Sequence, residues 1–295
     1  MSLVINNNIP ALNVANNLSQ HYSALMTSTR RLSSGLRVGT AADDAAGLAI
    51  RELMRADIAA YKQGIRNAND AISLIQTADG ALGVIDEKLI RMKELAEQAA
   101  TGTYDSTQRL MIESEYQAMA SEITRIANQT NFNSVKLIDG SLSGTHNGSG
   151  LHSEGQLKIH FGPSNGSAED YYYINIGSAT ASSLGLGNES NAATAGFAIS
   201  TQSAAQNALD AIREAIVSKD KIRAALGALQ NRLENTVSNL TIQAENLQAA
   251  ESRISDVDVA TEMTAFVRNQ ILAQAAVSML AQANALPRMA LNLIG

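Results

Sequence analysis

The four histidines are the side chains best suited to acid–base or metal chemistry, yet their positions do not form a recognisable set. They are His21, His146, His152 and His160. His146 and His152 stand in a stretch rich in Gly and Ser, together with Glu154, and these three residues form at most a weak metal site. Surface histidines without a ligand are far commoner, so we expect no metal ion here.

A pair of carboxylates, Asp43 and Asp44 in "TAADDAAGLAI", is the other candidate for chemistry. Adjacent residues on a helix point about 100° apart, so the two cannot share a proton as an acid–base pair. We expect them instead to complement the start of a helix, with Thr40 or Asp43 as its cap.

Motifs that carry catalysis are absent from the sequence. It has no Gly-rich phosphate loop, no GxSxG and no HExxH. The lack of Cys excludes disulfides, thiolate chemistry and Cys-based metal sites. We therefore expect no catalytic residues and no cofactor. An enzyme built around the histidines of residues 141–192 stays the most distant alternative.

Composition limits the partners. The net charge of -6 argues against nucleic acid, because phosphate binding needs clustered Lys and Arg. The first residues lack the basic and apolar regions of a signal peptide. Residues 269–287 carry no charge but include Asn, Gln and Ser, whereas a membrane span needs about 20 predominantly apolar residues. We expect no membrane insertion.

Three segments of the sequence show helical periodicity. The helices that they predict would position any functional side chain. The segment 41–101 carries apolar residues at alternating steps of three and four, which is typical of a heptad seam. The segment 105–129 repeats this spacing, and the segment 201–254 carries a ladder with a seven-residue step. The seam residues are Ala68, Ala71, Ile75, Ala78, Leu82, Ile85, Leu89, Met92, Ala96 and Ala99, and the ladder residues are Ile212, Leu226, Leu233, Leu240, Leu247 and Ile254, with Lys219 as a polar interruption.

Helix length then decides the expected fold class. A helix of about 60 residues is about 90 Å long, which exceeds the width of a compact domain of this size. Residues 141–192 differ, since "GQLKIHFG" and "DYYYINIG" alternate like two short strands. We expect a mainly α fold: a long antiparallel, coiled-coil-like helical rod with a small β-hairpin insert at its end, plus a domain in which the terminal helices pair.

Both ends of the chain are nearly uncharged. The first charged residue is Arg30, and after Glu262 only Arg268 and Arg288 carry charge. Exposed surfaces normally carry charge, so both ends look suited to burial; frayed termini are the alternative. The tail from Ser278 buries too little apolar surface to order alone. We expect it to order against the N-terminal segment and further copies of the chain, with Pro287 kinking or ending its helix.

Several long motifs resemble those of bacterial flagellin. "RLSSGLRVGTAADDAAGLAIRELMRADI", "RNANDAISLIQTADGAL" and "QTNFNSVKLIDG" are similar to its N-terminal signature. "AAESRISDVDVATEM" and "ILAQAAVSMLAQANALP" resemble its C-terminal signature. The likeness covers about residues 1–140 and 197–295, and the short middle indicates a short form without the large outer domains.

The resemblance implies a secreted structural subunit that polymerises into the flagellar filament for motility, outside the cell. It implies an inner domain of residues 1–40 and 256–295, a rod of 41–140 and 193–255, and an insert of 141–192. Its implied partners are other copies of the chain, a type III export chaperone, the filament cap and the hook–filament junction proteins.

Two sets of site residues follow as expectations. The residues expected to contact other subunits in the polymer core are Ile9, Leu12, Leu25, Leu280, Leu286, Leu291, Leu293 and Ile294. By resemblance, Arg91, Leu95, Gln98 and Glu115 align with the positions that Toll-like receptor 5 contacts, and the last three apolar residues of the first set resemble the triplet read by cytosolic immune sensors. From the residues alone, a membrane-active or pore-forming helical protein is the alternative function.

Overall fold

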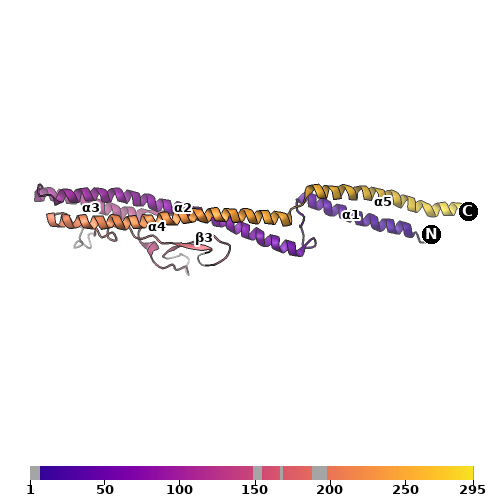
Figure 1. The fold of residues 1–295 in the computed structure, drawn as a ribbon, viewed down its shortest axis with the longest axis horizontal. Coiled ribbons are helices and arrows are strands. Elements are labelled where there is room, and N and C mark those ends of the chain that lie inside the picture. The colour runs from indigo at the N-terminus through magenta and orange to yellow at the C-terminus, as the bar shows by residue number, and fades with distance from the viewer. Residues whose placement is uncertain (1–6, 149–154, 167–168, 188–197, 295) are drawn as a thin grey trace. The chain divides into compact units, whose positions relative to one another are not determined.

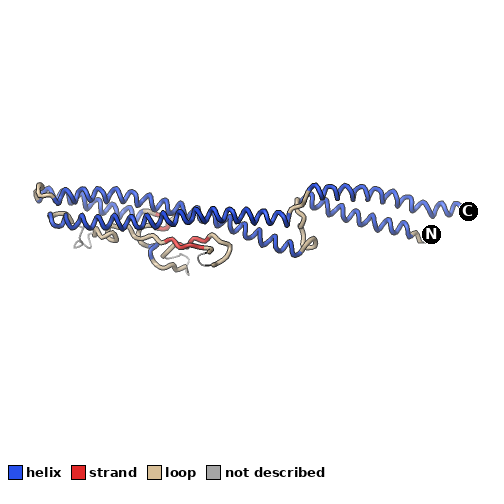
Figure 2. The backbone as a smooth tube through the Cα atoms, in the orientation of Figure 1, coloured by secondary structure: helices blue, strands red, loops and turns tan. Residues whose placement is uncertain are grey.

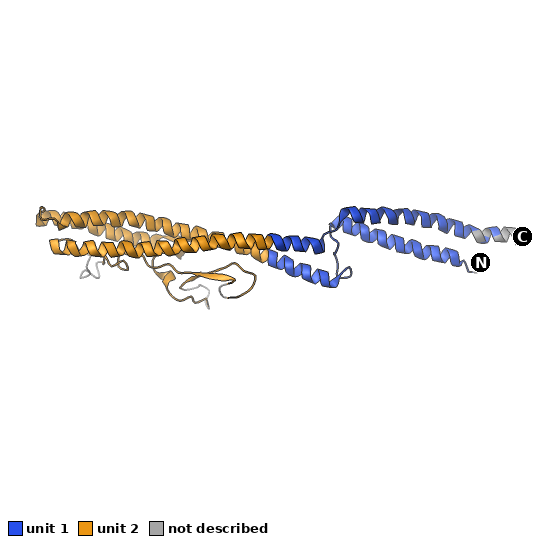
Figure 3. Cartoon of the chain, viewed as in Figure 1, with its two compact units in different colours: residues 1–58, 245–295 blue, residues 59–244 orange. Residues whose placement is uncertain are grey.

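The computed structural model describes residues 7–148, 155–166, 169–187 and 198–294, without the side chains of 286, 288 and 290–294. Helices make up most of the chain, and the strands are few and short (Figure 2). The contacts divide the chain into two compact units (Figure 3). Unit 1 comprises residues 1–58 and 245–295, and unit 2 comprises residues 59–244.

Unit 1 is built on an antiparallel pair of helices, α1 (Ile9–Ser34) and α5 (Val259–Ile294). They lie side by side, with the start of α1 and the end of α5 at the same end of the pair (Figure 1). The direction is fixed by two contacts, because Arg31 of α1 reaches Glu262 at 3.7 Å while Asn8 bonds to Ala283. Helix α1 ends at Gly35, whose φ of 73° is left-handed and suits a residue without a side chain. This is the predicted pairing of the terminal helices.

A short backbone ladder ties the two segments that connect these helices to the rest of unit 1. Arg37 N donates to Ser255 O at 2.7 Å, and Val257 N donates to Gly35 O at 3.0 Å. The guanidinium of the buried Arg51 donates to Val38 O at 2.6 Å. The ladder and the arginine satisfy backbone groups that the helices leave open.

The helix after this connection, α2 (Ala45–Ala100), is capped differently from our expectation. Asp44 Oδ1 accepts from Gly47 N at 2.9 Å, which is the N-cap bond. Asp43 instead accepts from the backbone N and hydroxyl of Thr40. The prediction of Thr40 or Asp43 as the cap was therefore wrong, because these two residues bond to each other in the turn before the helix.

In unit 2, residues 59–100 of α2 pack against α3 (Ser106–Gln129) and against the part of α4 (Gln202–Ser255) that extends to residue 244. All ten predicted seam residues of α2 are at most 2% exposed. Helices α2 and α4 run antiparallel, since Asp79 pairs with Arg223 and Asp86 with Lys219. The long antiparallel helices and the heptad seam are confirmed.

The insert adds small sheets to unit 2. Strands β1 (Asn131–Phe132) and β2 (Val135–Lys136) form a hairpin whose turn residues Asn133 and Ser134 have φ of 48° and 68°. Such a turn matches the twist of the strands. A short helix η1 (Ser141–Ser143) follows. Strands β3 (Leu157–His160) and β4 (Tyr171–Ile174) pair antiparallel, which confirms the predicted hairpin.

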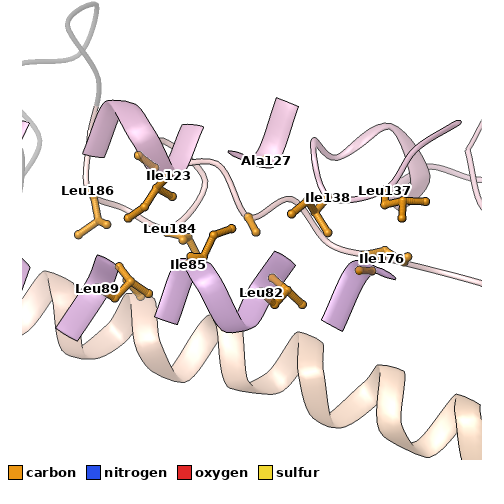
Figure 4. Packing of buried hydrophobic residues seen from close by; sticks show 14 of the residues in the cluster. Leu82, Ile85, Leu89, Ile123, Ala127, Leu137, Ile138, Ile176, Leu184 and Leu186 are labelled. Atoms are coloured by element: carbon orange, nitrogen blue, oxygen red, sulfur yellow. The ribbon is translucent and has the colours of Figure 1, made fainter. Parts of the chain in front are cut away.

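The described part of the insert lies along the side of α2, where Asn67 Nδ2 donates to His160 O, and so the expectation that the hairpin stands at the end of the rod was wrong. A Cβ on Gly64 would lie 2.0 Å from the carbonyl oxygen of Phe161, so only glycine lets the strand approach so closely. In the core, Leu82, Ile85 and Leu89 of α2 face Ile123 of α3 and apolar residues of the insert (Figure 4). Since α3 has only 24 residues, the insert covers the part of the α2 seam that α3 does not reach.

Candidate assembly and recognition surfaces

The terminal helices of unit 1 leave most of their apolar side chains exposed. Among the described side chains of α1 and α5, only Ser28, Ala273 and Ala283 are buried, and all three are small. The large apolar residues exposed on the two helices are Ile9, Leu12, Tyr22, Met26, Val259, Met263, Val267, Ile271, Leu272, Val277, Met279 and Met289. So many exposed large apolar side chains on one helix pair indicate an interaction site.

Half of the predicted polymer-core residues have described side chains. Ile9 and Leu12 are 58% and 62% exposed. Leu25 and Leu280 are partly buried between the helices. Leu286, Leu291, Leu293 and Ile294 lie in the helical backbone of α5, but their side chains are outside the described part.

A shallow groove of about 300 Å³ runs between the two helices. Its lining includes Tyr22 and Leu25 of α1 and Ala273 and Val277 of α5. The pair therefore leaves room for side chains from outside it, in addition to its exposed apolar faces.

Pro287 and Asn8 form a linked feature at the far end of the pair. Pro287 lies inside α5, which continues to Ile294, so of the two expectations for this residue, a kink or the end of the helix, the end is wrong. Proline has no N–H, so the carbonyl of Ala283, four residues earlier, loses its helical partner. Asn8 Nδ2 donates to that carbonyl at 2.9 Å, while its Oδ1 accepts from Ala11 N and caps α1.

Asp43 is the centre of a charged cluster near the other end of the pair. Its carboxylate accepts from Arg30 at 2.8 Å and lies 3.8 Å from Arg31. The hydrogen bond from the Thr40 hydroxyl is the main cause that lowers the pKa of Asp43, helped by the Thr40 backbone and the two arginines against the effect of burial. Asp43 thus stabilises the turn and forms ion pairs, while Asp44 caps α2. The two carboxylates have separate partners and do not act as an acid–base pair.

The predicted receptor-contact residues are only partly brought together. Arg91 Nε and Nη2 both donate to Glu115 Oε1, at 2.9 and 2.7 Å, and the two side chains are 49% and 44% exposed. Gln98 is exposed and donates to the hydroxyl of Tyr104. Leu95 is only 2% exposed, because it faces the core of unit 2.

The histidines assemble no ligand set in the described part of the chain. His146 bonds to Gln156 O at 2.7 Å, and His160 stacks on Tyr171. His152 and Glu154 lie outside the described residues. No group of acidic and histidine side chains able to hold a metal occurs among the described residues. Within the same limits, no helix has the length and apolar character needed to cross a bilayer.

Exposed apolar residues of unit 2 are the feature that sequence reasoning did not single out. Ile90 of α2, Leu110 and Met111 of α3, and Val217 and Ile242 of α4 all point to solvent. These apolar residues do not lie on the heptad seam. Their position outside the seam is the sequence signal that would have identified them. Lys219, noted only as an interruption of the ladder, is 1% exposed.

Comparison with known families and curated proteins gives one consistent result. Residues 5–143 match the bacterial flagellin N-terminal helical region, and residues 209–294 match the bacterial flagellin C-terminal helical region. The chain is 40% identical to a flagellin of Halalkalibacterium halodurans, over 99% of this chain and all of that protein. It is 42% identical to a flagellin of Bacillus subtilis, over 98% of this chain and 99% of that protein.

One solved structure adds a likeness of fold. A putative flagellar hook-associated protein from Vibrio parahaemolyticus aligns with a TM-score of 0.57 at 14% identity, covering 72% of this chain and all of that one. The crystal structure of Bacillus cereus flagellin aligns at 30% identity with a TM-score of 0.47, covering 63% of this chain and 94% of that one.

Proposed function

Because this chain belongs to the bacterial flagellin family, we propose that α1 and α5 complete their apolar core only when copies of it pack together. The chain is a structural subunit of the extracellular flagellar filament and not an enzyme. The membrane-active and enzymatic functions that the sequence left open as alternatives are therefore rejected. The coupling between assembly and the ordering of the terminal helices is the part that we propose.

The observation that carries the proposal is the exposure of Ile9 and Leu12 on a helix pair that buries only small side chains. A helix pair with so few buried apolar contacts opens at low free energy. Burying one large apolar side chain against another copy gains about 1.5–3 kcal/mol. Assembly therefore supplies the stability that the pair lacks by itself.

We propose three regions for the subunit in its filament. Residues 1–40 and 256–295 form the inner part, in which the terminal helices meet those of neighbours. Residues 41–140 and 193–255 form the rod, and residues 141–192 form the insert. The exposed apolar faces of α1 and α5 support the first assignment, and the seam of α2 supports the second.

Truncation tests the coupling directly. A chain lacking residues 285–295 should fail to extend filament seeds in an electron-microscopy growth assay. Its far-ultraviolet circular dichroism should retain most of the helical signal, because unit 2 keeps its core. Filaments of normal length from this chain would contradict the proposal.

A single substitution gives a sharper version of the same test. Leu12→Gln places an amide where we expect a contact between copies, and the seed-growth rate should fall at least about tenfold, as expected for a loss of 1.4 kcal/mol. Ser19→Gln, also at an exposed position of α1, is the matched control and should grow normally. Equal growth of the two variants would remove Leu12 from the polymer contacts.

The further partners belong to the same proposal. We propose that an export chaperone binds the C-terminal segment before secretion, and that the filament cap and the hook–filament junction proteins meet the subunit during assembly. The support is the apolar character of α5 after Glu262, where only Arg268 and Arg288 carry charge. A pull-down with α5-truncated chain that still recovered the chaperone would contradict this part.

We also propose that Toll-like receptor 5 recognises unit 2 through Arg91, Gln98 and Glu115, while Leu95 supports this surface from the core. Arg91→Ala should lower receptor signalling in a reporter-cell assay. Arg125→Ala removes a comparable exposed arginine, paired with Glu122, and should leave signalling intact. Equal signalling by the two variants would remove Arg91 from the contact.

A further inference from the structure

Lys219 is a charged residue on the buried apolar ladder of α4. On the ladder it stands between Ile212 and Leu226, which are 0% and 1% exposed. Its own side chain is 2% exposed. A lysine so deeply buried requires compensation of its charge.

Carboxylates from two helices meet the Lys219 ammonium. Nζ donates to Asp86 Oδ1 of α2 and lies 2.7 Å from Asp220 Oδ1 of its own helix. Asp86 is 31% exposed and Asp220 is 59% exposed, so the acids reach inward from the edge of the interface. One turn later Arg223 donates to Asp79 at 2.7 Å, on a more exposed flank.

Stability by itself does not account for this arrangement. Apolar residues of similar volume in place of a buried ion pair are often neutral or stabilising. A buried polar residue at one position of a heptad seam has another effect, because it specifies register at a cost in stability. Such a device has a use on α4, since the seven-residue step of its ladder returns a ladder residue to each level of the interface after a shift of one heptad.

The charges along α2 disfavour the two registers that lie one heptad to either side of the observed one. Positions 79, 86 and 93 of α2 share one heptad position and carry Asp, Asp and Lys. A shift of one heptad moves α4 by about 10.5 Å. In one direction Lys219 meets Lys93. In the other direction Lys219 pairs with Asp79. Arg223 then loses this carboxylate and lies level with Ile72.

We propose that Lys219, through its ion pair with Asp86, fixes a single register between α4 and α2 in unit 2. A shift in one direction sets Lys219 against Lys93, and an apolar residue at 219 removes that penalty. A shift in the other direction leaves Arg223 without its carboxylate, and that penalty is removed only when Arg223 is replaced as well. One register gives every copy of the chain the same surface on α4. A helical polymer requires such identity between its subunits.

The chain has no cysteine, so register can be measured with introduced labels. Glu87 of α2 and Glu234 of α4 are both exposed, and nitroxides on cysteines there are about 24 Å apart along the helix axes. Electron–electron double resonance should give one distance population in the otherwise unchanged chain. Lys219→Met should add a population displaced along the axis by about 10 Å, and Lys219→Met with Arg223→Gln should enlarge it.

Two controls separate register from stability. Lys221→Met removes the same charge from an exposed position of α4 and should keep a single distance. Asp86→Ala leaves the buried ammonium without its α2 partner and should lower the melting midpoint more than Lys219→Met does. A single distance in both Lys219 variants would overturn the proposal. A Lys219→Met chain that shows no cooperative unfolding of its helices would also overturn the proposal. The ion pair between Lys219 and Asp86 would then be needed for folding itself.

Discussion

In unit 2, the α2 seam residues from Ala68 to Ala99 are at most 2% exposed, whereas in unit 1 Ile9 and Leu12 of α1 are more than half exposed. Both regions carry apolar residues at helical spacing, so the pattern alone does not separate them. The difference lies in how many segments are available to cover each helix. Two helices, α3 and α4, and the insert cover the α2 seam in unit 2, while α1 has one partner helix, α5.

This comparison shows that the two units of the chain have different roles. Unit 2 completes its core within a single copy and gives the subunit a stable body. The terminal helices of unit 1 keep apolar surface open, and this surface suits contacts with neighbouring copies. Substitutions that remove buried surface should therefore act on folding in unit 2 and on assembly in unit 1.

The largest expected effect on folding is at the seam. Leu89 is fully buried, so Leu89→Ala should lower the free energy of unfolding by about 2–5 kcal/mol. Leu12→Ala, which truncates an exposed leucine, should change it by no more than about 0.5 kcal/mol. Chemical denaturation of the unassembled chain measures both values. Similar losses in the two variants would break the contrast between the units.

The next effect concerns the attachment of the insert to α2. Gly64→Ala forces Phe161 away from the helix and should cost about 1–3 kcal/mol, as overpacking does. Gly80 lies on the same helix with no atom within 4 Å of an added Cβ, so Gly80→Ala should stabilise by up to about 1 kcal/mol. Opposite signs in thermal unfolding would confirm the close approach; a stabilised Gly64→Ala chain would refute it.

Asn8 allows a smaller effect to be tested inside unit 1. Asn8→Ala removes both the cap of α1 and the bond to the Ala283 carbonyl, and should cost about 1 kcal/mol. Hydrogen exchange should then rise in the first turns of α1 while exchange in unit 2 stays constant. Asn8→Ser keeps a capping oxygen but loses the reach to α5, so it should recover only the protection of α1.

The smallest effect is expected from protonation of Asp43. Because its pKa is lowered in the folded chain, the charged form stabilises the turn above the ordinary pKa of about 3.9, and this contribution is lost as the pH falls through the lowered value. The protection of the amides at residues 35–44 against hydrogen exchange, corrected for the intrinsic exchange rate at each pH, should therefore fall at acidic pH. Asp43→Asn should show low protection there already at neutral pH and little further loss of protection on acidification.

The helices and the hairpin could be predicted because their signals are local and repeated. The steps of three and four from Ala68 to Ala99 match one face of a helix over many turns, and all ten residues are buried. The alternation around Leu157 and Tyr172 likewise placed both strands. The absence of charge before Arg30 and the near absence after Glu262 indicated ends suited to contact with other copies.

The candidate recognition surface was predictable only in part. Arg91, Leu95 and Gln98 share a face by helical spacing, yet Leu95 is buried while Arg91 and Gln98 are exposed. Spacing gives the angle between side chains, but the width of the buried stripe depends on which neighbours press against it. That width is a tertiary property.

The sequence by itself determined the periodicities, the strands and the charge-free ends, because these depend on residues near one another in the chain. Only the tertiary structure decided that Asp86 meets Lys219, that Asn8 takes the carbonyl left open by Pro287, and that the insert lies along α2 at Gly64. Each of these joins residues far apart in the sequence. Their partners follow from the register and packing of whole helices, which local propensity does not specify.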